Sequence, residues 1–151
     1  MPEEKTVVAP AVPAGPEMVT VTLNGRDIQA PRGASLLHVC LDNATPVPYF
    51  CDHRKLDPIG ACRMCVVQIE GQPKLATSCT ITASDGMKVS TESPEVLKAR
   101  EAVLEFLLIN HPLDCPVCDK GGECDLQDFS FYHGPGRSRF IEEKVKYPKP
   151  V

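Results

Sequence analysis

The sequence of 151 residues contains no tryptophan, and its aromatic residues are five Phe and three Tyr. Any hydrophobic core is therefore modest, sufficient for one ordinary domain or two small ones. No apolar run approaches the length of about 18–20 residues that a membrane-spanning helix needs, so no direct membrane span is expected.

Sequence signals for nucleotides, nucleic acids and export are also missing. Neither a G-x-G-x-x-G fingerprint nor a Walker A loop occurs, so the chain has no recognisable nucleotide site of its own. The net charge is −4 without a basic block, which argues against nucleic acid as a partner. The first residues, MPEEKTVVAPAVPAGPEM, lack the basic and apolar regions of a secretion signal. These absences favour a protein of the reducing bacterial cytoplasm.

The amino-terminal part of the chain predicts an α+β domain over residues 18–92. Residues 1–17 contain four prolines and are expected to form a disordered leader. The segment 19–30 alternates apolar and polar residues around Asn24-Gly25, which predicts a hairpin with a type I′ turn. The other expected elements are a helix over 34–44 with Ser35 as N-cap, an irregular loop over 51–65, and strands over 65–70, 74–83 and 87–91.

A second, smaller domain is expected over residues 93–135, followed by a C-terminal tail over 136–151. Ser93, Pro94 and Glu95 are typical of a helix start, and apolar residues then recur at helical spacing as far as Asn110. Pro112 ends this predicted helix, which leaves His111 at its C-terminal end, next to a cysteine-rich loop.

Eight cysteines are present, and in a reducing compartment their number favours metal binding or redox chemistry over disulfides. Four of them have the spacing C-x10-C-x2-C-x13-C, in which the C-x2-C pair can place two thiolates on one metal unit. Either zinc or an iron–sulfur cluster suits four thiolates. Gly60 would let backbone N–H groups approach the metal's sulfur atoms. These four candidate ligands are Cys51, Cys62, Cys65 and Cys79.

A second set of candidate ligands has the form H-x3-C-x2-C-x5-C and consists of His111, Cys115, Cys118 and Cys124. A histidine at a helix end often serves only as a cap or dipole partner, but three following cysteines favour metal ligation. The remaining histidines, His38, His53 and His133, are expected to be surface or packing residues, and Cys40 a core residue. Arg63, between two candidate ligands, could face a cluster, a partner or solvent.

The motifs resemble a known family. A ββα unit, a cysteine-bearing loop and further strands resemble the β-grasp ferredoxin fold, although the first gap departs from the C-x4-C of plant-type ferredoxins. PIGACRMC, PKLATSC and HPLDCPVCDKGGECDLQD resemble the amino-terminal region of the large iron–sulfur subunit of respiratory NADH:quinone oxidoreductase, or complex I. The resemblance implies a 2Fe–2S cluster on Cys51, Cys62, Cys65 and Cys79, and a 4Fe–4S cluster on His111, Cys115, Cys118 and Cys124.

The resemblance also implies a function. The chain would relay electrons in the peripheral arm of complex I, from NADH by way of a flavin-containing partner subunit toward quinone, on the cytoplasmic side of the inner membrane. It would thus be part of a translocating oxidoreductase, with no catalysis expected from this chain alone. Two alternatives remain: the homologous front end of a hydrogenase or formate dehydrogenase, and a structural zinc-binding module. The family's large iron–sulfur subunit is much longer, so the chain is either a fragment or a short subunit.

Overall fold

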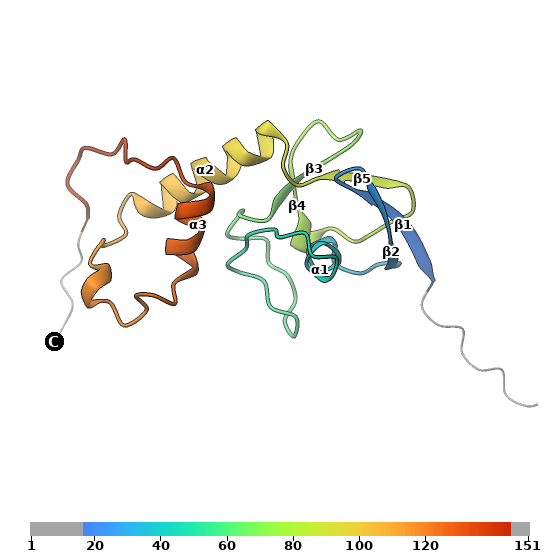
Figure 1. Cartoon of the computed structure of the whole chain (residues 1–151), viewed down its shortest axis with the longest axis horizontal. Coiled ribbons are helices and arrows are strands. Elements are labelled where there is room, and N and C mark those ends of the chain that lie inside the picture. The colour runs from blue at the N-terminus through green and yellow to red at the C-terminus, as the bar shows by residue number, and fades with distance from the viewer. Residues whose placement is uncertain (1–16, 146–151) are drawn as a thin grey trace, which may run out of the picture.

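The structure, a computed structural model, describes residues 17–145. The predicted leader therefore lies outside the described residues except for Glu17, as does the end of the predicted tail, residues 146–151. Figure 1 shows two lobes: the sheet and helix α1 form one, and the C-terminal half of helix α2 forms the other with helix α3. Within the described residues, no helix is long and apolar enough to cross a membrane.

A five-stranded mixed sheet forms the first lobe, in the order β2-β1-β5-β3-β4. The strands are β1 (Met18–Leu23), β2 (Arg26–Pro31), β3 (Val66–Ile69), β4 (Ala76–Thr77) and β5 (Met87–Ser90). β1 and β5 run parallel, whereas the other neighbours are antiparallel. The predicted hairpin is confirmed, because Leu23 pairs with Arg26 and both residues between them have positive φ, 49° at Asn24 and 80° at Gly25.

Helix α1 (Leu36–Asp42) covers the sheet and closes its hydrophobic core. The confirmed alternation of β1 turns one face inward, and Cys40 is fully buried among the core residues, as predicted. The helix is shorter than the expected 34–44 because the backbone of Ala44 turns left-handed (φ 53°). Thr45 N–H then donates to the Cys40 carbonyl. The core residues shared by strands and helix are Val19, Val21, Leu23, Leu36, Leu37, Val39, Cys40, Val67, Ile69 and Val89.

The strand expected over 74–83 is wrong for most of its length. Only Ala76–Thr77 pairs as β4, and Ser78–Thr80 forms a 3₁₀ turn, η1. The turn is closed by side chains, since the hydroxyls of Thr77 and Thr80 lie 2.6 Å apart and that of Thr80 also contacts the Thr77 carbonyl. Such local bonds from Thr compete with a strand ladder.

Helix α2 (Pro94–Leu108) connects the two lobes and begins as predicted, with Ser93 accepting from Val96 N–H at 3.4 Å. It ends two residues before Asn110. Its buried positions are Val96, Arg100 and Leu104, one residue every four, so the helix faces the rest of the molecule along a narrow stripe. The sequence pattern did not predict an arginine in that stripe.

Two elements of the second lobe were not predicted individually: a 3₁₀ turn, η2 (Cys115–Val117), and helix α3 (Asp125–His133). Helix α3 packs on α2 and also reaches the first lobe, because the rings of Phe129 and Phe50 meet edge to face with centroids 5.1 Å apart. Phe50 directly precedes the candidate ligand Cys51. The second lobe therefore contacts the first lobe next to the first set of thiols.

Candidate metal centres

The four cysteines of the first set come together from two parts of the chain. Cys51 and Cys62 form one pair, in which Cys62 N–H donates to the Cys51 sulfur at 3.4 Å. Cys79 lies next to Cys65, because the preceding residue, Ser78, donates its backbone N–H and its hydroxyl to the Cys65 carbonyl. Besides burial, the thiols of Cys65 and, more weakly, Cys51 raise the pKa of Cys79. The structure thus brings the four residues that the spacing selected into two pairs.

The loop that carries Cys51, Cys62 and Cys65 has an unusual backbone. Gly60 (φ 61°) and Arg63 (φ 59°) both adopt left-handed conformations. A side chain at Gly60 would be strained by this φ and would also place its Cβ only 2.9 Å from Thr80 Cγ2. Both the φ of Gly60 and its close contact with Thr80 favour glycine at position 60. The reason expected from the sequence, the approach of backbone N–H groups to the metal's sulfur atoms, stays a prediction.

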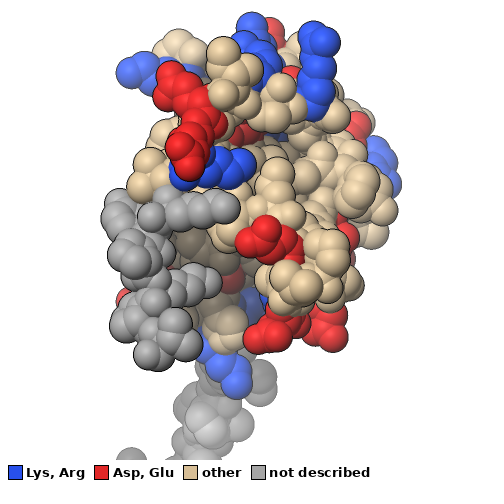
Figure 2. Space-filling model, turned by 90° about the vertical axis from the view of Figure 1, so that its left-hand side faces the viewer, with Lys and Arg blue, Asp and Glu red and all other residues tan. Residues whose placement is uncertain are grey.

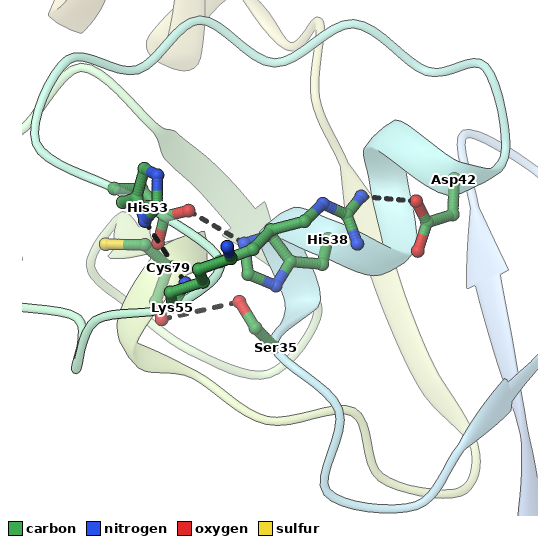
Figure 3. A network of polar contacts seen from close by, with 8 residues as sticks. Ser35, His38, Asp42, His53, Lys55 and Cys79 are labelled. Carbon is green, nitrogen blue, oxygen red and sulfur yellow. Dashed lines mark hydrogen bonds and ion pairs between the residues drawn. The ribbon is translucent and has the colours of Figure 1, made fainter.

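Hydrogen bonds to backbone carbonyls hold Cys65 and Cys79 in place. Ser78, fully buried, donates from its backbone N–H (3.0 Å) and its hydroxyl (2.8 Å) to the carbonyl of Cys65. The hydroxyl of Ser35, at the start of α1, lies 3.4 Å from the Cys79 carbonyl (Figure 3). Ser35 occupies the predicted N-cap position but makes no capping bond and contacts the ligand segment instead. With Cys65 and Cys79 almost fully buried, this side of the site is shielded from water.

The thiols differ in acidity. Burial raises the pKa of Cys62, but hydrogen bonds from the backbone of Met64, Phe50 and Cys51 and from the Cys51 side chain together outweigh it, so the pKa is lowered overall. Burial, followed by the neighbouring Cys65 thiol, raises the pKa of Cys79 to about 12. A bound metal ion would deprotonate such a thiol outright.

His38 is more than a surface or packing residue. Its Nε2 lies 2.7 Å from the carboxylate of Asp52, whose side chain is 5% exposed and which follows Cys51 (Figure 3). Arg54 and Asp42 form a further, exposed pair between the same loop and α1. Two polar contacts thus hold the ligand loop against α1. His53 stays exposed, as expected, and accepts from the Lys55 N–H.

The second set lies in the other lobe. Cys115 and Cys118 are joined by the η2 turn, and Gly121 N–H donates to the Cys118 carbonyl at 2.9 Å. Gly121 touches the backbone so closely that a Cβ there would lie 2.6 Å from the Cys115 carbonyl oxygen. Cys124 then takes the N-cap position of α3. The three cysteines therefore lie on one tightly folded loop.

His111 follows the end of α2, as the sequence indicated, and is half-buried. Lys144 donates from Nζ to the carbonyls of Leu108 (2.6 Å) and His111 (3.0 Å). Val145 N–H donates to Asn110 Oδ1 at 3.0 Å. Residues 139–145, which belong to the predicted tail, thus return to the helix end that carries His111.

Within the described chain, no three His, Cys, Asp or Glu side chains are close enough to hold a single metal ion.

Sequence reasoning missed four residues next to the candidate ligands: Asp52, Ser78, Arg100 and Lys144. Only Arg100 had a detectable signal, because it lies four residues from Val96 and from Leu104 on the apolar stripe of the predicted helix.

The end of the molecule that carries η2 exposes apolar side chains. Figure 2 shows this end, where uncharged residues lie among groups of acidic and basic side chains. The exposed large side chains of the second lobe include Leu113 (60%), Val117 (84%), Phe131 (87%) and Tyr132 (81%).

Comparison with known proteins identifies the family of the chain. The model of the 2Fe–2S iron–sulfur cluster binding domain matches residues 16–94, which include the first set. The chain belongs to this family. Residues 100–139, which include the second set, match the NADH-ubiquinone oxidoreductase-G iron–sulfur binding region.

Its relatives confirm the resemblance to the large iron–sulfur subunit. The chain is 52% identical over 145 residues to the G subunit of NADH-quinone oxidoreductase from Streptomyces coelicolor, covering 95% of this chain and 17% of that protein. It is 50% identical over 127 residues to the NADH-ubiquinone oxidoreductase 75 kDa subunit of Reclinomonas americana, covering 84% of this chain and 18% of that protein. The chain therefore spans less than a fifth of the length of these relatives.

A solved structure shares the fold. A chain in the crystal structure of NAD+-reducing [NiFe]-hydrogenase in the H2-reduced state is 29% identical and superposes with a TM-score of 0.75. The match covers 88% of this chain and 55% of the hydrogenase chain. The α+β iron–sulfur domain expected from the sequence is thereby confirmed, together with a second iron–sulfur binding region.

Proposed function

We propose that the chain is an electron-transfer module that binds one 2Fe–2S and one 4Fe–4S cluster. The first cluster's ligands are Cys51, Cys62, Cys65 and Cys79, and the second cluster's ligands are His111, Cys115, Cys118 and Cys124. We assign residues 18–92 to the first domain and 93–135 to the second, which the two family matches support.

The observation that carries the proposal is the grouping of the first four thiols into two pairs. A 2Fe–2S cluster needs two protein ligands on each of its irons, whereas a single zinc ion gathers all four ligands around one point. We assign Cys51 and Cys62 to one iron, and Cys65 and Cys79 to the other. The buried backbone next to Cys65 and Cys79 would keep water from an iron held by this pair.

The second cluster is supported by the loop and the helix end. The η2 turn and the close approach at Gly121 fix two of the three cysteines, and Lys144 holds the backbone of His111. A neutral imidazole in place of a thiolate removes one negative charge from the cluster unit, a change that favours reduction.

Each cluster would supply one-electron chemistry, and the protein would set distance, burial and polarity. The contact between Phe50 and Phe129 would hold the two cluster lobes at a fixed separation. Because the two NADH oxidoreductase relatives are 50% and 52% identical and the hydrogenase chain 29%, we favour complex I over a hydrogenase as host. The flavin-containing subunit and other peripheral-arm subunits would be the partners, on the cytoplasmic side of the membrane.

Metal and sulfide analysis tests this proposal. Protein purified anaerobically, or reconstituted with iron and sulfide, should bind about six iron atoms, two in one cluster and four in the other, with matching acid-labile sulfide. A colourless protein that holds two zinc ions and no labile sulfide when purified anaerobically from its host would instead support a structural zinc module.

A further inference from the structure

Arg100 is the most deeply buried charged residue among those described, at 1% exposure. It lies in the middle of α2, where the helix faces β3. Its guanidinium donates from one terminal nitrogen to the carbonyl of Val66 at 2.9 Å, and its Nε has no hydrogen-bond partner. A buried charge with an unsatisfied N–H lowers stability, so fold stability alone gives no reason for it.

The surroundings of Arg100 link it to the first set of thiols. Val66 follows Cys65 directly, and the Cys65 carbonyl is held by Ser78. Arg100 and Ser78 therefore hold two consecutive carbonyls beside a candidate ligand. The charge of Arg100 acts on the thiol of Cys65 and on that of Cys40. Burial lowers the pKa of Arg100 to about 10, which still leaves it protonated at neutral pH.

We propose that Arg100 is a positioning residue that raises the reduction potential of the two-iron cluster, by holding the Cys65–Val66 backbone and by placing one fixed positive charge behind it. The inference rests on the proposed function, because it requires a cluster on these thiols. Reduction adds one negative charge to the cluster, and a nearby buried cation stabilises the reduced form more than the oxidised one. Water screens the charge little, since the side chain is almost completely buried.

A purely structural role makes a different prediction. Replacing a buried ion by an apolar residue of similar volume is often neutral or stabilising. If Arg100 served only to fill space, Arg100→Met would leave the cluster's potential unchanged. If it sets the potential, Arg100→Met would lower the potential whatever its effect on stability.

The test is a redox titration of the iron-loaded protein, followed by low-temperature EPR of the 2Fe–2S signal. Arg100→Met and Arg100→Gln should lower the midpoint potential of the 2Fe–2S cluster. At the wild-type midpoint, the ratio of reduced to oxidised cluster should fall on the order of tenfold, which corresponds to about 59 mV for a one-electron couple. Arg100→Lys keeps the charge and should retain most of the wild-type potential.

Two control variants on the same helix separate charge from stability. Lys98→Met removes an equal charge from an exposed position and should leave the midpoint within a small fraction of that shift. Leu104→Ala lies one turn after Arg100, is fully buried and destabilises the same packing without changing charge. It should lower the unfolding temperature and leave the midpoint in place, even where it reduces the yield of protein.

The outcomes distinguish this inference from the proposed function. Failure of the wild-type protein to assemble a 2Fe–2S cluster would overturn both. An assembled cluster whose midpoint is the same in wild type, Arg100→Gln and Arg100→Met would overturn only the role of Arg100. A lowered midpoint that Leu104→Ala reproduces would assign the shift to packing and overturn the role as well.

Discussion

Gly121→Ala should abolish the 4Fe–4S cluster and leave the 2Fe–2S cluster intact. In the structure, a Cβ at position 121 would lie 2.6 Å from the Cys115 carbonyl oxygen and 3.0 Å from that of Cys118. Moving the Cys115 oxygen out to 3.4 Å, where ordinary contact begins, needs a displacement of 0.8 Å. Both atoms belong to the backbone of candidate ligands, so no flexible side chain can yield instead.

The displacement exceeds what a cluster site tolerates. Functional groups must be held within about 0.5 Å of their productive positions, and overpacking of this kind costs about 1–3 kcal/mol. The turn that would have to move is held by short-range bonds, including Gly121 N–H to the Cys118 carbonyl at 2.9 Å. The alanine variant should therefore assemble about two irons per chain instead of about six.

Iron and labile-sulfide content after anaerobic reconstitution, with EPR of the dithionite-reduced protein, measures this effect. Gly122→Ala is the matched control: its φ of 86° strains an alanine, but no atom lies within 4 Å of the added Cβ. The free energy of unfolding of that variant should fall by about 1–2 kcal/mol, and both clusters should remain. Full iron content with an unchanged four-iron signal in Gly121→Ala would refute the assignment of this loop as a ligand loop.

Three further predictions concern the rest of the chain. Cys40→Ala truncates a fully buried side chain and should lower the free energy of unfolding, measured by denaturant titration, by about 1–2 kcal/mol. Both EPR signals should persist, and selective loss of either would show a wrong ligand assignment. Lys144→Met removes two hydrogen bonds at the end of α2 and should speed the loss of the four-iron EPR signal when a chelator is added, with the two-iron signal as internal control. Equal rates of signal loss in wild type and variant would contradict a role of Lys144 in holding His111. The pure chain should not oxidise NADH with an artificial acceptor, since no nucleotide site is recognisable; steady turnover without an added flavoprotein would disprove this.

Local sequence signals predicted the parts of the molecule that local chemistry decides. Asn24-Gly25 specified its turn, and Ser93 with Pro94 specified the start of α2. The cysteine spacing selected four thiols that the fold brings together. Each of these features depends on residues close in sequence or on a family motif.

Other features depend on long-range contacts. The strand expected after Lys74 breaks because Ser78 bonds to Cys65 and Thr77 to Thr80, a preference that alternation cannot show. Helix α3 gave little sequence signal, since its N-cap is Cys124 in place of the usual Ser, Thr, Asp or Asn. Arg100 is buried where α2 faces β3, and its hydrogen bond joins residues that are 34 positions apart in the chain.

The most direct test of the central claim is low-temperature EPR of dithionite-reduced wild type, His111→Ala and His111→Cys. If His111 ligates the four-iron cluster, the alanine variant should lose that cluster, convert it to a three-iron form or change its spectrum, while the 2Fe–2S signal persists. The cysteine variant restores a ligand but adds a negative charge, so any cluster it assembles should have a lower potential. An unaltered four-iron signal in His111→Ala at full iron content would contradict the ligation by one histidine and three cysteines.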